Sequence, residues 1–219
     1  MKHPISDRLL ACAAFVRQGD RIADVGCDHG YLSIHLLQEN IAVSAICSDV
    51  RPQPLQSAIR NARKYGLRNK MEFYLSDGVQ NIPRDFNTLI CAGMGADTMV
   101  SILKAAPWLK DGKYRLILQC QSKTPMLRQY LSDEGYAITK ELVLRDGRFL
   151  YTVMEVVFAP EQTRLTPAQY YLPEVLSGEE VDAYRAWVIG GIKIAVSHQN
   201  DPQKEAILRE LEDTYDHRK

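Results

Sequence analysis

The segment Asp24-Val25-Gly26-Cys27-Asp28-His29-Gly30-Tyr31 is the most informative stretch of this sequence. It follows an apolar run at residues 22–25 and precedes a helical pattern that places Leu32 and Leu36 on one face. Glycine has no Cβ, so it permits a sharp turn and a close approach of the backbone to a ligand. We interpret the segment as a strand-to-helix turn that holds a nucleoside cofactor. A tight turn with no ligand is the alternative.

Short apolar runs alternate with helical patterns over most of the chain. The runs predict strands at residues 22–25, 43–47, 71–75, 88–91 and 116–118. This alternation predicts an α/β protein with a parallel, doubly wound sheet. Residues 137–144 and 149–158 flank Arg145-Asp146-Gly147-Arg148, which is typical of a hairpin turn. A mostly parallel sheet of seven strands that ends in an antiparallel hairpin is the Rossmann-like class I methyltransferase fold.

Acidic residues follow the second and third predicted strands. Asp49 ends the second strand, where a carboxylate hydrogen-bonds the ribose hydroxyls of a bound nucleoside. Asp77 follows the third strand, at the place that meets the adenine amino group in this fold. A nicotinamide cofactor is disfavoured, because its fingerprint needs glycine at Asp28 and glycine or alanine at Tyr31. We therefore predict a site for S-adenosylmethionine, composed of Asp24, Gly26, Asp28, Gly30, Asp49, Val50, Asp77, Gly78, Gly93 and Met94.

The fourth predicted strand ends in Ala92-Gly93-Met94-Gly95-Ala96. In this fold that edge faces the transferred methyl group. The segment lacks the Asn/Asp-Pro-Pro-Tyr pattern of enzymes that methylate exocyclic amino groups of bases. Its two glycines leave room for a planar ring, although a second tight turn is the simpler interpretation.

These motifs together resemble the bacterial tRNA (adenine-22 N1)-methyltransferases, most specifically in Asp28-His29-Gly30-Tyr31 and Ala92-Gly93-Met94-Gly95. The resemblance covers nearly the whole chain. It implies methyl transfer to N1 of adenine 22 in the D-arm of tRNA. It also implies an N-terminal catalytic domain and a C-terminal, coiled-coil-like domain that helps to hold the tRNA.

Three side chains of the glycine turn are candidates for catalysis. Asp28 can stabilise the positive charge that develops on the methylated ring, or relay a proton. His29 can hydrogen-bond the base, and Tyr31 can stack on it. The structural alternatives are a helix cap for Asp28 and a packing residue for Tyr31.

Basic residues are the candidates for RNA contacts. Arg60, Arg63 and Lys64 share one helix face in a stretch that contains no acidic residue. This face is either simply solvated or a track for phosphates. Arg8, on the first predicted helix, and Gln121 and Lys123, after the fifth strand, are placed nearer to the expected active edge of the sheet.

The C-terminal part changes in pattern. We predict a catalytic domain over residues 1–159 and a helical hairpin over residues 160–219, outside the sheet. Prolines at positions 160, 167 and 173 indicate a linker, and Ser177-Gly178-Glu179-Glu180 predicts a capping box. Asp201-Pro202 then starts a second helix. The apolar stripes of the two helices are Val181, Tyr184, Val188, Ile192 and Ala195, and Ile207, Leu211 and Tyr215.

Composition gives only broad limits. The net charge is +0, and the residues up to 154 carry 20 basic and 15 acidic side chains, against 7 and 12 in the remainder. The five cysteines form no C-x-x-C pair, which disfavours a disulfide framework or a zinc site. We expect a cytoplasmic protein with tRNA as partner, no membrane segment and no metal. The oligomeric state and the choice of tRNA remain open.

Two other functions remain open. One is a methyltransferase that acts on a small molecule or a protein, and the other is a non-catalytic RNA-binding module on the same fold. The retained acids at Asp24, Asp49 and Asp77 disfavour the second of these.

Overall fold

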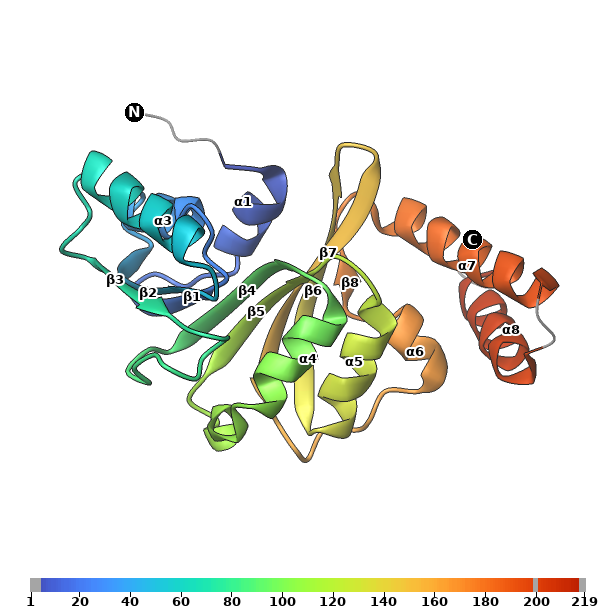
Figure 1. Cartoon of the computed structure of the whole chain (residues 1–219). Coiled ribbons are helices and arrows are strands. Elements are labelled where there is room, and N and C mark those ends of the chain that lie inside the picture. The colour runs from blue at the N-terminus through green and yellow to red at the C-terminus, as the bar shows by residue number, and fades with distance from the viewer. Residues whose placement is uncertain (1–4, 199–200, 217–219) are drawn as a thin grey trace.

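A mixed sheet of eight strands forms the centre of the computed structural model, which describes residues 5–198 and 201–216 (Figure 1). The strand order is β3-β2-β1-β4-β5-β7-β6-β8. The first five strands are parallel, and β7 runs antiparallel to both β5 and β6. The strands are β1 (Asp20–Val25), β2 (Ala42–Asp49), β3 (Met71–Leu75), β4 (Thr88–Met94), β5 (Arg115–Cys120), β6 (Tyr136–Asp146), β7 (Phe149–Phe158) and β8 (Leu176–Ser177). This confirms the predicted fold class.

Helices cover both faces of the sheet. On one face lie α1 (Asp7–Ala13), α2 (Tyr31–Gln38) and α3 (Pro52–Lys64). The other face carries α4 (Ala96–Lys104), the 3₁₀ helix η1 (Pro107–Asp111) and α5 (Thr124–Asp133), of which α4 and α5 lie in front of the sheet in Figure 1. Along β4, Leu89 and Cys91 pack on the second face and Ile90 on the first. Both faces are apolar, as a parallel sheet with helices on each side requires.

The eighth strand corrects the prediction that the C-terminal part lies outside the sheet. Leu176 and Ser177 pair with Glu141 and Leu142 of β6, so a segment beyond residue 160 extends the sheet. The short helix α6 (Pro167–Tyr171) contacts α5. The division into two domains at residue 160 stays a prediction.

The predicted capping box at residues 177–180 is wrong. The Ser177 hydroxyl donates to the Glu141 carbonyl, and the Glu180 carboxylate accepts from Arg145. A capping box exists instead at Thr166 and Gln169, in front of α6. Pro167 is the first residue of α6, a position where its missing N–H has no consequence, and it therefore starts a helix.

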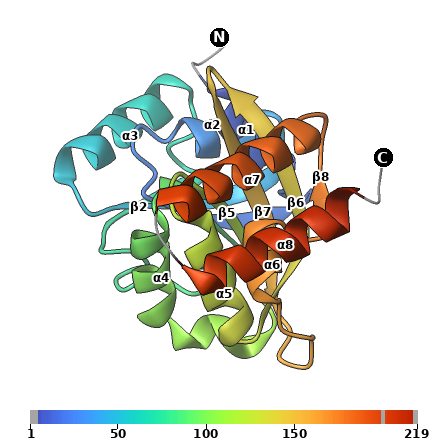
Figure 2. The same ribbon diagram turned by 90° about the vertical axis from the view of Figure 1, so that its right-hand side faces the viewer.

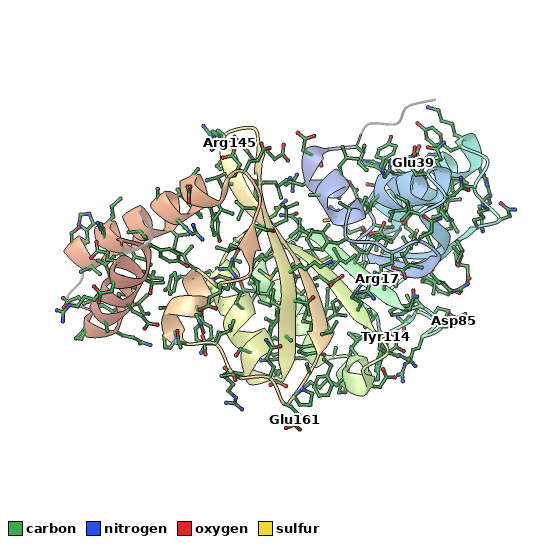
Figure 3. The ribbon with its side chains drawn as sticks, turned by 180° about the vertical axis from the view of Figure 1, so that it is seen from behind. Arg17, Glu39, Asp85, Tyr114, Arg145 and Glu161 are labelled. Carbon is green, nitrogen blue, oxygen red and sulfur yellow. The ribbon has the colours of Figure 1, made fainter. Side chains whose placement is uncertain are left out.

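Two long helices end the chain, as predicted. They are α7 (Val181–His198) and α8 (Pro202–Asp216), which lie side by side (Figure 2). Two backbone N–H groups of the first turn of α8 donate to the Asp201 carboxylate. The predicted stripes, apart from Ala195, pack on each other and on the sheet residue Val143. At the tip of the β6–β7 hairpin, Arg145 pairs with Glu180 just before α7 (Figure 3).

A buried ion pair joins these helices to the sheet. The Arg128 guanidinium, on α5, donates to both carboxylate oxygens of Glu141 on β6, at 2.6 and 3.1 Å. It also donates to the carbonyls of Tyr170 and Tyr171 and to the Tyr184 hydroxyl of α7. Both charged side chains are fully buried. Arg128 thus connects four separate elements through one side chain.

We predict that Arg128→Met lowers the free energy of unfolding by about 3–5 kcal/mol, because it leaves the buried Glu141 carboxylate without its partner. Urea denaturation measures this loss. Adding Glu141→Leu to the variant should recover part of the stability, since the unpaired charge is then gone. Arg145→Met is the matched control, because its pair with Glu180 lies at the surface, where solvent screens the interaction, so its loss should change the stability little. Equal stability of the two single variants contradicts the prediction.

Candidate functional site

A cavity of about 430 Å³ opens at the carboxyl ends of β1, β2, β3 and β4. Every residue predicted to bind the cofactor lines it, except Gly30. Parallel strands bring these segments together because their carboxyl ends share one edge of the sheet. Acidic groups predominate: Asp24, Asp28, Asp49 and Asp77 line the cavity together with Arg8 and Arg51.

The turn after β1 has an unusual backbone. Gly26, Asp28 and Gly30 all have positive φ, at 70°, 49° and 73°. A Cβ at Gly26 would lie 2.2 Å from Cε, the flexible end of Met94, so that side chain would have to move, and the positive φ of Gly26 favours glycine as well. Gly30, with its left-handed backbone, is the N-cap of α2. The helix-cap alternative for Asp28 is therefore wrong.

Asp49 holds the turn in place. Its side chain is 5% exposed. One carboxylate oxygen accepts the Asp28 N–H at 3.2 Å, and the other accepts the Arg51 N–H at 2.9 Å. Each carboxylate oxygen has a further lone pair, which leaves capacity for two hydroxyl donors of a ligand. This geometry agrees with the predicted ribose contact.

Asp24 is buried at the end of β1. The Ser33 hydroxyl donates to its carboxylate at 2.7 Å. Burial raises the pKa of Asp24 to about 6, because the charged form loses its hydration. A cation bound in the cavity would favour the charged form again.

Residues after β2 and β3 form the wall opposite the turn. Val50 is 62% exposed although it is apolar, and Asp77 is exposed close to it in the same cavity. A Cβ at Gly78 would lie 2.9 Å from Ile102, so the chain passes α4 closely here. An apolar surface beside a carboxylate acceptor suits an adenine ring with its amino group.

A hydrogen-bonded chain supports the end of β4. The register with β5 shifts between Ala92 and Met94, and the Gly93 N–H donates to the Gln119 side chain at 2.9 Å. Gln119 also accepts from Arg8, which pairs with Asp146 at the tip of the hairpin. The sequence interpretation missed Gln119 and Asp146. A polar residue within the apolar run of β5 was the signal for Gln119.

The three catalytic candidates lie together. Asp28 and His29 have side chains that are 59% and 51% exposed, with 3.8 Å between the carboxylate and Nε2. The rings of His29 and Tyr31 are 5.9 Å apart. All three residues line the cavity.

The RNA-binding candidates occupy different places. Gln121 lines the cavity, whereas Lys123 lies beyond it and pairs with Asp97. Arg8 lines the cavity, stacks over the Tyr151 ring and pairs with Asp146, so its guanidinium has intramolecular partners. On α3, Arg60, Arg63 and Lys64 are all exposed outside the cavity.

The described residues contain neither a cluster of metal ligands nor a membrane-spanning helix. Across 5–198 and 201–216, no three His, Cys, Asp or Glu side chains are grouped as a metal ion would require. Within the same residues, no helix combines the length and apolar character needed to cross a membrane.

Comparisons with known proteins agree with this site. A family described as "Methyltransferase domain" matches residues 5–154. The tRNA (adenine(22)-N(1))-methyltransferase of Bacillus subtilis is 32% identical over 151 residues, which are 68% of this chain and 63% of that enzyme. A putative tRNA methyltransferase of Mycoplasma pneumoniae is 32% identical over 154 residues, 68% and 69% of the two chains. The sequence match thus spans less than two thirds of the Bacillus enzyme.

A solved structure matches over a longer range. A putative tRNA (m1A22) methyltransferase of Streptococcus pneumoniae, in complex with S-adenosyl-L-methionine, is 28% identical with a TM-score of 0.84. The match covers 95% of this chain and 99% of that chain. These similarities confirm the resemblance that the motifs indicate.

We expect Asp49→Ala to weaken the binding of S-adenosylmethionine about 10- to 150-fold, because a hydrogen bond to a buried charged group contributes about 1.5–3 kcal/mol. Isothermal titration calorimetry measures the affinity. Asp85→Ala is the control, since Asp85 pairs with Arg21 at the opposite ends of the strands (Figure 3). Unchanged affinity in Asp49→Ala excludes the ribose contact.

Cofactor affinity should also depend on pH through Asp24. Its pKa near 6 means that the carboxyl group is charged at pH 7.5 and becomes neutral as the pH falls below about 6. A cationic ligand then loses an attractive partner, so affinity should fall by up to about tenfold per pH unit below pH 6. Asp24→Asn should remove this transition, and His29→Gln should retain it. A constant affinity from pH 5 to pH 8 contradicts the assignment.

Proposed function

Since this chain belongs to the methyltransferase domain family, we propose that it transfers a methyl group from S-adenosylmethionine to N1 of adenine 22 in tRNA. The observation that carries the proposal is the cavity at the carboxyl edge of the sheet, where four carboxylates and three glycines converge. The similarity to the Bacillus and Streptococcus proteins supports the choice of base and position.

The residues of the cavity fit this cofactor. Glycine at positions 26 and 78 leaves space that a Cβ would occupy, and Asp49 retains acceptor capacity for ribose hydroxyls. The excess of carboxylates suits a ligand with a positively charged sulfonium and amino group. Its volume of about 430 Å³ lies in the range of small-molecule sites.

When bound, S-adenosylmethionine supplies an electrophilic methyl group on a good leaving group. Adenine N1 carries an in-plane lone pair, so it attacks without prior deprotonation. Positioning is then the main task of the protein, and orientation contributes up to about 7–11 kcal/mol in favourable reactions. The bulge at Gly93, supported by Gln119, leaves an open edge for the ring.

Asp28 is the residue that we assign to electrostatic stabilisation. The attacked ring gains positive charge as the new bond forms, and a carboxylate in the same cavity stabilises that charge. Tyr31 offers a ring for stacking, and His29 a hydrogen-bonding group. Because N1 lies on the Watson–Crick edge, a paired target adenine must first be unpaired or flipped out.

We also propose a cytoplasmic location. tRNA is modified there, and all five cysteines are free and buried, which suits a reducing compartment.

Nucleoside mass spectrometry of unmodified tRNA after reaction with the purified protein tests the proposal. The expected product is 1-methyladenosine at position 22, dependent on S-adenosylmethionine. Labelled methyl transfer to protein or small-molecule fractions, with none to tRNA, would support the alternative methyltransferase. Absence of transfer to every fraction, with RNA binding retained, would support a non-catalytic module.

Asp28→Asn should bind both substrates but lose about 10²–10³-fold in the rate of the chemical step. Asparagine adopts positive φ readily, so the substitution preserves the backbone at φ 49° and removes only the charge. Single-turnover methylation with both substrates saturating measures the rate. Asp97→Asn is the control, because it removes a carboxylate at the start of α4 that does not line the cavity. A rate within a few-fold of wild type would mean that positioning alone carries the reaction.

A further inference from the structure

A second cavity, of about 340 Å³, adjoins the first. One wall consists of the start of α5 and of residues 150–152 in β7, and the other is α7. Gln121 lines both cavities, so they are neighbours. In Figure 2, α7 crosses in front of β5 and β7. Of the residues that line it, only Gln121 and Lys123 are among the RNA-contact candidates named above.

Its walls are aromatic and basic. Trp187 is 63% exposed, and its ring lies 5.8 Å from that of Tyr184. Tyr151 contributes a third aromatic side chain. Lys123 and Lys204 also line the cavity, and none of the described residues that line it is acidic.

The two lysines have partners outside the cavity. Lys123 pairs with Asp97 at 2.9 Å and Lys204 with Asp201 at 3.2 Å. The first pair is mostly exposed on both sides, so its interaction is weak and readily exchanged for another anion. The cavity therefore combines flat apolar surfaces with positive charge, which suits a base and its phosphate.

Two adjacent glycines inside α7 also point to this cavity, independently of its aromatic and basic lining. Gly190 and Gly191 lie inside an 18-residue helix, where glycine is the least favourable residue after proline. A Cβ at either position would meet no atom within 4 Å, so packing within the protein does not require glycine. Gly191 lines the second cavity, whereas Gly190 does not. Because it has no side chain, Gly191 leaves free space in that cavity.

We propose that the second cavity binds an unpaired nucleotide of the RNA substrate, adjacent in the strand to the methylated adenine. This inference rests on the proposed function. An adenine drawn into the first cavity leaves the stack, and its neighbour then loses a stacking partner. The exposed ring of Trp187 replaces that partner, and the lysines meet the backbone phosphate. The helix α7 thereby forms one wall of the substrate site.

Gly191→Leu and Gly190→Leu form a matched pair of test variants. Both replace glycine by a better helix former, but only the first fills the cavity. For Gly191→Leu, we expect about tenfold to hundredfold weaker binding of an unmodified tRNA transcript and a similar loss in kcat/KM. Its affinity for S-adenosylmethionine and its urea midpoint should not fall. Gly190→Leu should match wild type in tRNA affinity, kcat/KM and cofactor affinity, and its urea midpoint should not fall either.

Fluorescence gives a second readout. Trp108 packs against Phe86 and Tyr114, so Trp108→Phe leaves Trp187 as the single tryptophan of the chain. Addition of the transcript should quench its emission, because a base stacks on the exposed ring. Unchanged emission at saturating transcript would overturn the proposal.

Activity and affinity measurements distinguish failure of the proposed methylation of tRNA from failure of the proposed nucleotide cavity. If wild type does not methylate tRNA, the proposed function fails. If wild type is active and Gly191→Leu is equally active with equal tRNA affinity, only the nucleotide cavity is wrong. A changed sedimentation coefficient in Gly191→Leu with normal tRNA binding would instead identify the groove as a contact between copies of the chain.

Discussion

The close passage of the β1–α2 turn beside the end of β4 is the constraint on which the site depends. The turn is held by backbone hydrogen bonds from Gly26 and Cys27 to the Ser48 carbonyl, and by the Asp28 N–H to Asp49. Glycine at position 26 permits the positive φ of the turn and leaves the Met94 side chain in place at the end of β4. These contacts bring the ends of β1, β2 and β4 together, and the carboxylates of Asp24, Asp28 and Asp49 at the first two ends then share one cavity.

The reacting edge is supported from a distant part of the chain. Asp146 at the hairpin tip pairs with Arg8, which contacts Gln119, and Gln119 accepts the Gly93 N–H. The antiparallel hairpin thus does more than close the sheet. It gives α1 a charged contact and stabilises, through a buried amide, the bulge that faces the expected methyl group.

A similar arrangement anchors the C-terminal helices. Burial of both Arg128 and Glu141 requires complete hydrogen bonding, because an unpaired charge in the interior is costly. The guanidinium meets this requirement with partners from β6, α6 and α7. The position of α7, and with it the wall of the second cavity, is therefore coupled to the catalytic sheet by a rigid contact.

Sequence patterns alone predicted the strands, the hairpin, the two apolar stripes and the candidate cofactor residues, which line one cavity except for Gly30. These features follow from short segments of sequence. An apolar run predicts a strand, and a glycine or an acidic residue after a strand predicts a ligand-binding turn, in any chain of this fold. The eighth strand and the capping box of α6 escaped prediction, because a two-residue strand has no periodicity and Pro167 resembled a linker proline. Only the tertiary structure decided that Asp28 is not a cap, that Arg8 is paired, and that Trp187 and Gly191 lie beside Gln121. Such facts depend on which distant segments meet, and a linear pattern does not contain that information.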